Sequence, residues 1–305
     1  MFEDDPVPFE ARLEARANAV EMLLRQLLDG RALDGEIDRP QRLLAAMRHG
    51  VLNGGKRLRP FLVLESAALF DADTDAAMRV AAALECVHCY SLIHDDLPAM
   101  DDDDLRRGQP TVHRAFDEAA AILAGDSLLT YAFDILADEA TAIAARHKID
   151  LVSGLARAAG LGGMAGGQAL DLAAEKSTPD EAGIIRIQAM KTGALIRYAC
   201  EAGAILAGAS ASDRARLAEF GSAVGLAFQL ADDLLDVTAN AEIMGKATGK
   251  DAAAGKATLV ALHGVDWARR QLSGLVAQAH GLLEPYGERA VFLKQAASFV
   301  ADRRN

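Results

Sequence analysis

The stretch HCYSLIHDDLPAMDDDDLRRG, residues 88–108, determines how the rest of the chain is interpreted. Six aspartates lie between Asp95 and Asp104, and Arg106 and Arg107 follow almost directly. Close like-charged pairs on a helix each cost about 0.2–0.5 kcal/mol, so we expect a bound cation to offset the repulsion. Mg2+ is the natural candidate, because it prefers oxygen ligands and usually shares them with a substrate's phosphate groups.

The residues that precede the aspartates predict a central helix. From Asp75 to about Leu97 the chain is apolar nearly all round, which is typical of a helix buried on every side. Pro98 is expected to end or distort this helix just where the charges begin. The chain is 51% hydrophobic and has only eight prolines and no alternating Val/Ile/Thr runs. We therefore predict one all-α domain over residues 1–305, with ten or more helices around a central cavity.

Apolar periodicity predicts further helices on both sides of the central one. We expect Thr74 and Ser212 to cap two helices, and the glycine-rich run 162–167 to be flexible. The expected helical ranges are 9–28, 41–52, 60–70, 75–97, 117–146, 149–160, 179–207 and 213–237, with more helices after residue 258.

Charge and cysteine content exclude several classes of protein. The net charge of −12 argues against nucleic acid as a general partner. No uncharged apolar run reaches about 18 residues, so no membrane span is expected. The acidic start MFEDDPVPFE does not resemble a secretory signal. Cys86 and Cys89 form a lone C-x-x-C inside a helical pattern, which we interpret as buried thiols in a reducing cytoplasm rather than a redox or zinc site.

A second carboxylate cluster lies near the end of another apolar run, in the segment FQLADDLLD, residues 228–236. Asp232 and Asp236 are four residues apart and therefore share one face of a helix, and Asp233 lies three residues before Asp236. If the two helices line one cavity, the two clusters face each other. Opposed carboxylates that hold Mg2+ around a diphosphate form a site for activating a leaving group.

Several motifs together resemble the trans-polyprenyl diphosphate synthases, and most of all the bacterial farnesyl diphosphate synthases. The similar motifs are DDLPAMD at 95–101 with RRG at 106–108, DDLLD at 232–236, GGKRLRP at 54–60, the pair Lys191–Thr192, and the spaced lysines Lys246 and Lys256. The resemblance covers about residues 40–260. It implies an all-α prenyltransferase fold, a homodimer, and three bound Mg2+ ions, with Mn2+ as an alternative metal.

The resemblance also implies a role for each matching residue. The metal ligands are Asp95, Asp101 and Asp232, supported by Asp96 and Asp236; isopentenyl diphosphate is held by Gly55, Lys56, Arg59, His88 and Arg107; the allylic diphosphate is held by Arg106, Lys191, Thr192, Gln229, Lys246 and Lys256; and product length is set by Tyr90 and Ser91. The simpler alternatives are a solvated acidic patch, a solvated basic loop around Lys56, and a core role for His88.

The implied reaction is a head-to-tail condensation. The allylic C–O bond breaks, isopentenyl diphosphate attacks the resulting carbocation, and a proton is lost, so no side-chain nucleophile is expected. Farnesyl diphosphate is the expected product. A geranylgeranyl diphosphate synthase and a non-catalytic partner subunit of a synthase are the alternatives, and a class I terpene cyclase would have no need for the GGKRLRP motif.

Overall fold

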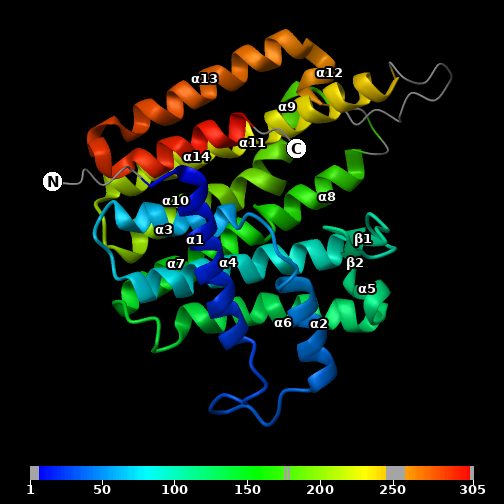
Figure 1. The fold of residues 1–305 in the computed structure, drawn as a ribbon, viewed down its shortest axis with the longest axis vertical. Coiled ribbons are helices and arrows are strands. Elements are labelled where there is room, and N and C mark those ends of the chain that lie inside the picture. Colours follow the sequence, from blue (N-terminus) through cyan, green and yellow to red (C-terminus); the bar gives the residue numbers. More distant parts are fainter. Residues whose placement is uncertain (1–6, 175–176, 178, 245–257, 303–305) are drawn as a thin grey trace. The chain divides into compact units, whose positions relative to one another are not determined.

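The structure is a computed structural model that describes residues 7–174, 177, 179–244 and 258–302. Its contacts group into two units, residues 1–152 and 153–305. Within the described ranges the elements are helices, apart from one two-stranded hairpin (Figure 1). The predicted all-α fold is therefore confirmed, and the single domain over residues 1–305 stays a prediction.

The first unit is organised around one buried helix. Its elements are α1 Phe9–Leu27, α2 Gln41–Val51, α3 Leu58–Ala68, α4 Thr74–Asp95, β1 Leu105–Arg106, β2 Gln109–Pro110, α5 Val112–Ala115, α6 Glu118–Ala137 and the first part of α7 Ala145–Ala159. α4 packs against α1, α2, α3 and α6, as its all-round apolar sequence predicts. α4 and α6 lie alongside each other in opposite directions (Figure 1). Arg79 lies 3.2 Å from Asp138 near one end, and His94 Nε2 lies 3.1 Å from the Ile122 carbonyl oxygen near the other.

The second unit is built around the long helix α11. Its elements are α8 Met164–Ala174, α9 Glu181–Gln188, the π-helical turn η1 Ala189–Gly193, α10 Ala194–Leu206, α11 Ala211–Met244, α12 Leu259–His263, α13 Val265–Leu283, the 3-10 turn η2 Glu284–Ala290 and α14 Val291–Ala301. α11 packs against α10, α13, α14 and η1. A Cβ at Gly225 would lie 2.9 Å from the Cα of Gly193, so these two backbones cross at a distance that only glycine permits.

Two of the predicted helix caps are wrong by one or two residues. The carboxylate of Asp73, not the hydroxyl of Thr74, accepts a backbone N–H at the start of α4. At the start of α11, Ser210 Oγ rather than that of Ser212 accepts the N–H of Asp213 at 3.1 Å. Asp and Ser are both good N-capping residues, so sequence alone does not separate them from neighbouring candidates.

The predicted helix over residues 117–146 is also wrong, because α6 ends at Ala137. Asp138 adopts an extended conformation there. The amine of Lys148 then donates to the carbonyl oxygens of Ala137 and Asp138, at 3.3 and 2.5 Å. A cation from the next helix thus satisfies the carbonyls that α6 leaves open at its end.

The glycine-rich run 162–167 is partly helical rather than a flexible loop, since α8 begins at Met164. Its glycines have a packing role. A Cβ at Gly166 would collide with the carbonyl oxygen of Leu161, and one at Gly167 would collide with the backbone N of Lys191. The lack of side chains therefore lets α8 approach the π-helical turn η1 closely.

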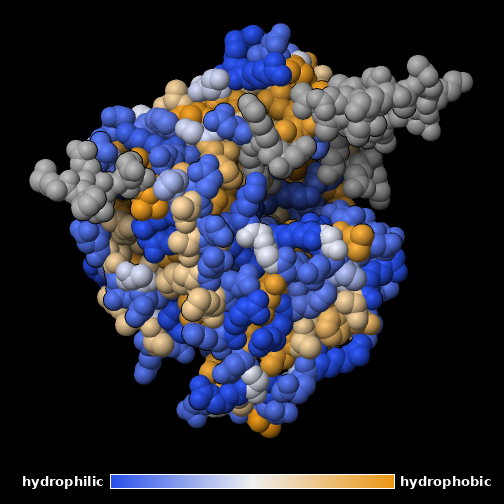
Figure 2. All heavy atoms as spheres, in the orientation of Figure 1, coloured by the Kyte–Doolittle hydropathy of each residue, from blue (hydrophilic) through white to orange (hydrophobic). Residues whose placement is uncertain are grey.

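Two helices, α4 and α6, are long and apolar enough to span a bilayer by length and composition alone. Two thirds of the apolar window of α4 is buried against other helices, which explains its composition without a membrane. On the face drawn in Figure 2, hydrophobic residues form separate patches among hydrophilic ones. A membrane span is therefore not shown.

The interpretation of the C-x-x-C motif as buried thiols is confirmed. Cys86, Cys89 and Cys200 are all buried and none forms a disulfide. Burial raises the pKa of Cys89 to about 12, and it raises that of Cys86 as well. Both groups are therefore protonated thiols at neutral pH, which are poor nucleophiles and poor metal ligands.

Candidate functional site

The first aspartate motif begins at the last residue of α4. Asp95 is half-buried there, and the chain turns through Pro98 so that the backbone N–H of Asp101 donates to the carbonyl oxygen of Asp95 at 2.8 Å. The turn places the two predicted ligands next to each other, with Asp101 exposed. One or two carboxylates completed by phosphate oxygens are the usual ligands of Mg2+, so this donor set fits the predicted metal.

Asp96, the next residue along the chain, is buried, with 3% of its surface exposed. Its Oδ1 accepts from Arg106 Nε at 2.6 Å, and Nη2 of the same guanidinium also contacts Asp103 at 3.3 Å. Burial raises the pKa of Asp96, and Arg106 opposes that shift. Asp96 therefore orients Arg106, a partnership that the sequence analysis did not predict.

The hairpin β1–β2, also not predicted, presents the neighbouring cation. Arg107 and Gly108 form its turn, both with positive φ. Arg107 Nη1 donates to Asn53 Oδ1 at 3.1 Å and to the carbonyl oxygen of Gly54. Gly55 has a φ of 114°, which favours glycine, and a Cβ there would also meet the Arg107 guanidinium.

The cations of the GGKRLRP motif gather beside α4. Arg59 Nη1 lies 3.3 Å from His88 Nε2, and Lys56 is exposed on the loop before α3. Burial lowers the pKa of His88 well below its ordinary value, with Arg59 and Arg107 adding to the shift. His88 is therefore neutral at physiological pH and can form hydrogen bonds without adding charge. The first unit thus brings Arg59, His88, Arg107 and the Gly54–Gly55 turn together, as predicted.

Arg57, in the same motif, has a different position from its neighbours. Its positive φ of 49° turns the side chain into the core, where Nη1 donates to Glu85 at 2.5 Å and Nη2 donates to the carbonyl oxygen of Val51 at 2.5 Å. Arg57 thereby joins the end of α2 and the start of α3 to α4. This role was not predicted from the sequence, where the available signal was an acidic residue, Glu85, in the apolar middle of a helix.

The two residues predicted to set product length lie one turn before Asp95. Ser91 Oγ donates to the carbonyl oxygen of His88 at 2.8 Å. The ring of Tyr90 contacts that of His94 edge-on, with the centroids 5.8 Å apart. Burial raises the pKa of Tyr90, and the nearby charge of Asp95 raises it further. Tyr90 is thus within electrostatic reach of the first aspartate.

The second unit brings together its own predicted residues around Asp233. This carboxylate is buried and accepts from Gln188 Nε2 at 2.8 Å and from Gln229 Nε2 at 3.1 Å. Thr192 Oγ1 then donates to Gln229 Oε1 at 3.2 Å. Asp233 and Gln188 fix the orientation of Gln229, and the sequence analysis assigned no such role to Gln188.

The π-helical turn η1 presents the remaining cation. Lys191 Nζ lies 2.6 Å from Asp171 Oδ2, a pair that was not predicted. On α11, Asp232 is half-buried and Asp236 is exposed. Lys246 and Lys256 lie outside the described residues. Within the ranges that the structure describes, no three His, Cys, Asp or Glu side chains are close enough to hold a metal without further ligands.

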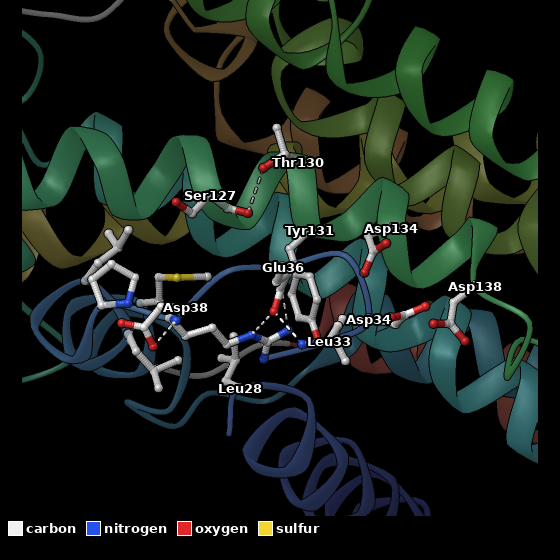
Figure 3. Close-up of a pocket in the computed structure, with 15 residues that line it drawn as sticks. Leu28, Leu33, Asp34, Glu36, Asp38, Ser127, Thr130, Tyr131, Asp134 and Asp138 are labelled. Atoms are coloured by element: carbon white, nitrogen blue, oxygen red, sulfur yellow. Dashed lines mark hydrogen bonds and ion pairs between the residues drawn. The ribbon is translucent and has the colours of Figure 1, made fainter. Parts of the chain in front are cut away.

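A cavity of about 550 Å3 in the first unit, shown in Figure 3, contains none of the predicted residues. Its lining combines aliphatic side chains with the carboxylates of Asp34, Glu36, Asp38, Asp134 and Asp138. Arg39 enters the cavity, donates to Glu36 at 2.7 Å and lies 5.4 Å from the centre of the Tyr131 ring. Because a carboxylate lining repels a diphosphate, we do not assign substrate to this cavity.

Comparisons with known proteins agree with the motifs. Residues 40–284 match the family described as polyprenyl synthetase. The farnesyl diphosphate synthase of Escherichia coli (strain K12) is 46% identical over 271 residues, which are 86% of this chain and 89% of that protein. The farnesyl diphosphate synthase of Geobacillus stearothermophilus is 41% identical over 265 residues, 87% of each chain.

Solved structures and plant relatives are also similar. The structure of an FPP/GFPP synthase from Zymomonas mobilis has a TM-score of 0.86 and 44% identity, and the match covers 96% of this chain and 98% of that one. Geranylgeranyl pyrophosphate synthase 9 of Arabidopsis thaliana is 40% identical over 88% of this chain and 76% of its own. The chain therefore belongs to the polyprenyl synthetase family and is a prenyltransferase.

Proposed function

We propose that this prenyltransferase condenses isopentenyl diphosphate with dimethylallyl or geranyl diphosphate to form farnesyl diphosphate. The observation that carries the proposal is the arrangement at the end of α4. The cations Arg59 and Arg107 gather there with a neutral His88, two turns before the adjacent pair Asp95 and Asp101. Such a site offers a diphosphate direct cations on one side and metal-binding oxygens on the other.

Isopentenyl diphosphate occupies the metal-free side. Arg59 and Arg107 supply forked guanidinium donors, Lys56 adds an exposed charge, and neutral His88 adds a hydrogen bond. Because Gly55 has no side chain, the guanidinium of Arg107 can lie directly against the backbone at that position. Because Arg59 and Arg107 already contact the protein, they are held in place before substrate binds, which reduces the entropy lost on binding.

The allylic diphosphate is held by Arg106, Lys191, Thr192 and Gln229, together with Lys246 and Lys256. Asp96 and Asp171 keep Arg106 and Lys191 in place until the diphosphate shares those cations. Mg2+ bound by Asp95, Asp101 and Asp232, with Asp96 and Asp236 in support, would neutralise charge on the departing diphosphate. The C–O bond breaks, the carbocation is attacked by the double bond of isopentenyl diphosphate, and the departed diphosphate takes the released proton.

The farnesyl product depends on Tyr90, with Ser91 beside it. An aromatic ring one turn before Asp95 limits the depth of the hydrocarbon pocket and therefore the length of the prenyl chain. Tyr90→Ala is thus expected to shift the product from farnesyl toward geranylgeranyl diphosphate. An unchanged product ladder on chromatography contradicts this role. Geranylgeranyl diphosphate is the second candidate product, because synthases of that name are among the relatives.

Incubation of the purified protein with labelled isopentenyl diphosphate, an allylic diphosphate and Mg2+ tests the proposal. Farnesyl diphosphate as the main product supports it, and geranylgeranyl diphosphate supports the second candidate. If the full chain forms no product while a related synthase is active in a parallel reaction, the result favours the alternative that the chain is a non-catalytic partner subunit. We also propose a homodimer in the cytoplasm, and light scattering of the purified chain tests the dimer.

A further inference from the structure

The imidazole of His94 is held on the side of α4 that faces α6. Its Nε2 lies 3.1 Å from the carbonyl oxygen of Ile122. A carbonyl oxygen only accepts hydrogen bonds, so Nε2 carries the proton and donates it. His94 directly precedes Asp95, yet this bond ties its ring to the neighbouring helix and not to the aspartate.

Gly125 on α6 provides the space for this ring. A Cβ at position 125 would collide with Nε2 of His94 and would lie 2.8 Å from Cε1. Glycine inside a helix is destabilising relative to alanine. The α6 sequence around this position is rich in alanine, so a glycine here has a packing reason, and that reason is the His94 ring.

The same imidazole also contacts the ring of Tyr90. The two rings meet edge-on, at an interplanar angle of 76°, one helical turn apart. Edge-to-face aromatic pairs are stabilising beyond the area they bury, which favours one ring position over others. Tyr90 is only half-buried, so the contact with the His94 ring is one of the restraints on its position.

We propose that His94 and Gly125 determine product length by fixing the ring of Tyr90. The inference rests on the proposed function, in which Tyr90 closes the hydrocarbon pocket. Gly125 leaves space on α6 for the ring of His94, which lies there against the Ile122 carbonyl. From that position His94 holds Tyr90 where it stops chain growth. His94 and Gly125 are positioning residues, since neither is required to touch the substrate.

His94→Ala removes the edge contact and the hydrogen bond together. The ratio of geranylgeranyl to farnesyl diphosphate is expected to rise about tenfold, the change that one or two methylenes make in a hydrophobic pocket. Gly125→Ala displaces the same ring and is expected to raise the ratio as well. The ratio is measured within one reaction, so a lower overall rate or a smaller folded fraction does not alter it.

Two further variants make the test specific. In the His94→Ala background the added methyl of Gly125→Ala enters the space that the ring has left, so the double variant is expected to show the ratio of His94→Ala alone. Gly50→Ala is the matched control, because its Cβ crowds Ile93, the adjacent residue on another face of α4. It is expected to lower stability and leave the ratio unchanged.

The outcomes separate this inference from the proposed function. If the wild-type chain forms no prenyl product, or Tyr90→Ala keeps the farnesyl product, the proposed function or its length rule is wrong and the inference is overturned with it. If Tyr90→Ala lengthens the product while His94→Ala and Gly125→Ala both keep the wild-type ratio, only the inference is overturned. The inference is also overturned if Gly125→Ala changes the product ratio equally in the wild-type and His94→Ala backgrounds.

Discussion

Glu85 carries a charge in the core of the first unit, with 2% of its surface exposed. A buried charge is tolerated only when it is paired, and its partner is Arg57, which also donates to the carbonyl oxygen of Val51. One turn further along α4, the neutral His88 has its Nε2 3.3 Å from Arg59 Nη1. The two contacts fix the segment 57–59 against α4, and with it the loop that presents Lys56.

Glu85→Gln is expected to weaken binding of isopentenyl diphosphate. Loss of one partner from a buried ion pair costs about 3–5 kcal/mol of stability. The loosened loop should then raise KM for isopentenyl diphosphate about tenfold, with a smaller effect on KM for the allylic substrate. Steady-state kinetics with each substrate varied in turn measure the difference.

Glu65→Gln is the matched control, because Glu65 is buried and paired with Arg12 and Arg16 away from this loop. It is expected to lower the unfolding temperature without separating the two KM values. If Glu85→Gln raises KM equally for both substrates, the Glu85–Arg57 pair stabilises the fold and has no specific effect on isopentenyl diphosphate.

His88 makes the stability of the chain depend on pH. Its pKa is held below the ordinary value of 6.5, mainly by burial and then by Arg59. Below about pH 6.5 the unfolded chain therefore binds a proton that the folded chain does not. The free energy of unfolding should fall as the pH drops below this value, by at most about 1.4 kcal/mol per pH unit, and His88 should contribute no pH dependence above it.

Urea unfolding of the wild type and of His88→Gln, from about pH 7.5 to pH 5.5, measures this contribution as the difference between the two curves. The difference in free energy of unfolding between the two proteins should narrow as the pH falls. Only the wild type is destabilised at low pH, because only its unfolded chain takes up a proton at position 88. Parallel curves would mean that His88 is not held neutral by its surroundings.

Among the elements, the π-helical turn η1 carries Lys191 and Thr192, which in the proposed function hold the allylic diphosphate. A π-turn places one extra residue in a helix, and such turns are frequent at functional sites. Here it projects Lys191 toward Asp171 and Thr192 toward Gln229. α8 packs against the turn, with a close approach at Gly167.

Gly167→Ala is expected to disturb this turn, because the new Cβ would collide with the backbone N of Lys191. KM for the allylic diphosphate should rise about tenfold through the lost alignment of Lys191 and Thr192, while KM for isopentenyl diphosphate changes little. Gly274→Ala on α13 is the control, since nothing lies within 4 Å of its Cβ position. It should raise stability slightly, by up to about 1 kcal/mol. A Gly167→Ala enzyme with unchanged kinetics would contradict the role of the turn.

The elements also show what sequence reasoning can and cannot supply. The central helix and the residue types at its end were predictable, because apolar periodicity and clustered aspartates are local signals. Arg57 and Arg59 are the same residue two positions apart, and only the positive φ of Arg57 sends it into the core. The hairpin at Arg107 and the π-turn at Lys191 likewise depend on contacts from distant segments, which leave no periodic pattern in the chain.

For the whole molecule, the central question is whether the two aspartate clusters act as one site. The chain has a net charge of −12, and its prenyltransferase family is a group of divalent-metal enzymes whose substrates are themselves anionic. Metal ions and local cations must therefore outweigh an unfavourable overall field. If Asp95 and Asp232 bind the same ions, substitution of either one should disable the shared site. Substitution of the other in the same chain should then lower kcat little further.

A double-mutant cycle on Asp95→Asn and Asp232→Asn tests this prediction. Each single variant should lower kcat by about 10²–10³, the usual cost of removing one electrostatic contact to a transition state. Because residues that act as a unit are strongly non-additive, the double variant should lose little more than the worse single variant. Asp104→Asn is the control from the same acidic stretch: this exposed residue pairs with Arg114 at 2.5 Å, and its loss should leave kcat near the wild-type value. If the loss in the double variant equals the product of the two single losses, the clusters act independently, and the proposed shared metal site is wrong.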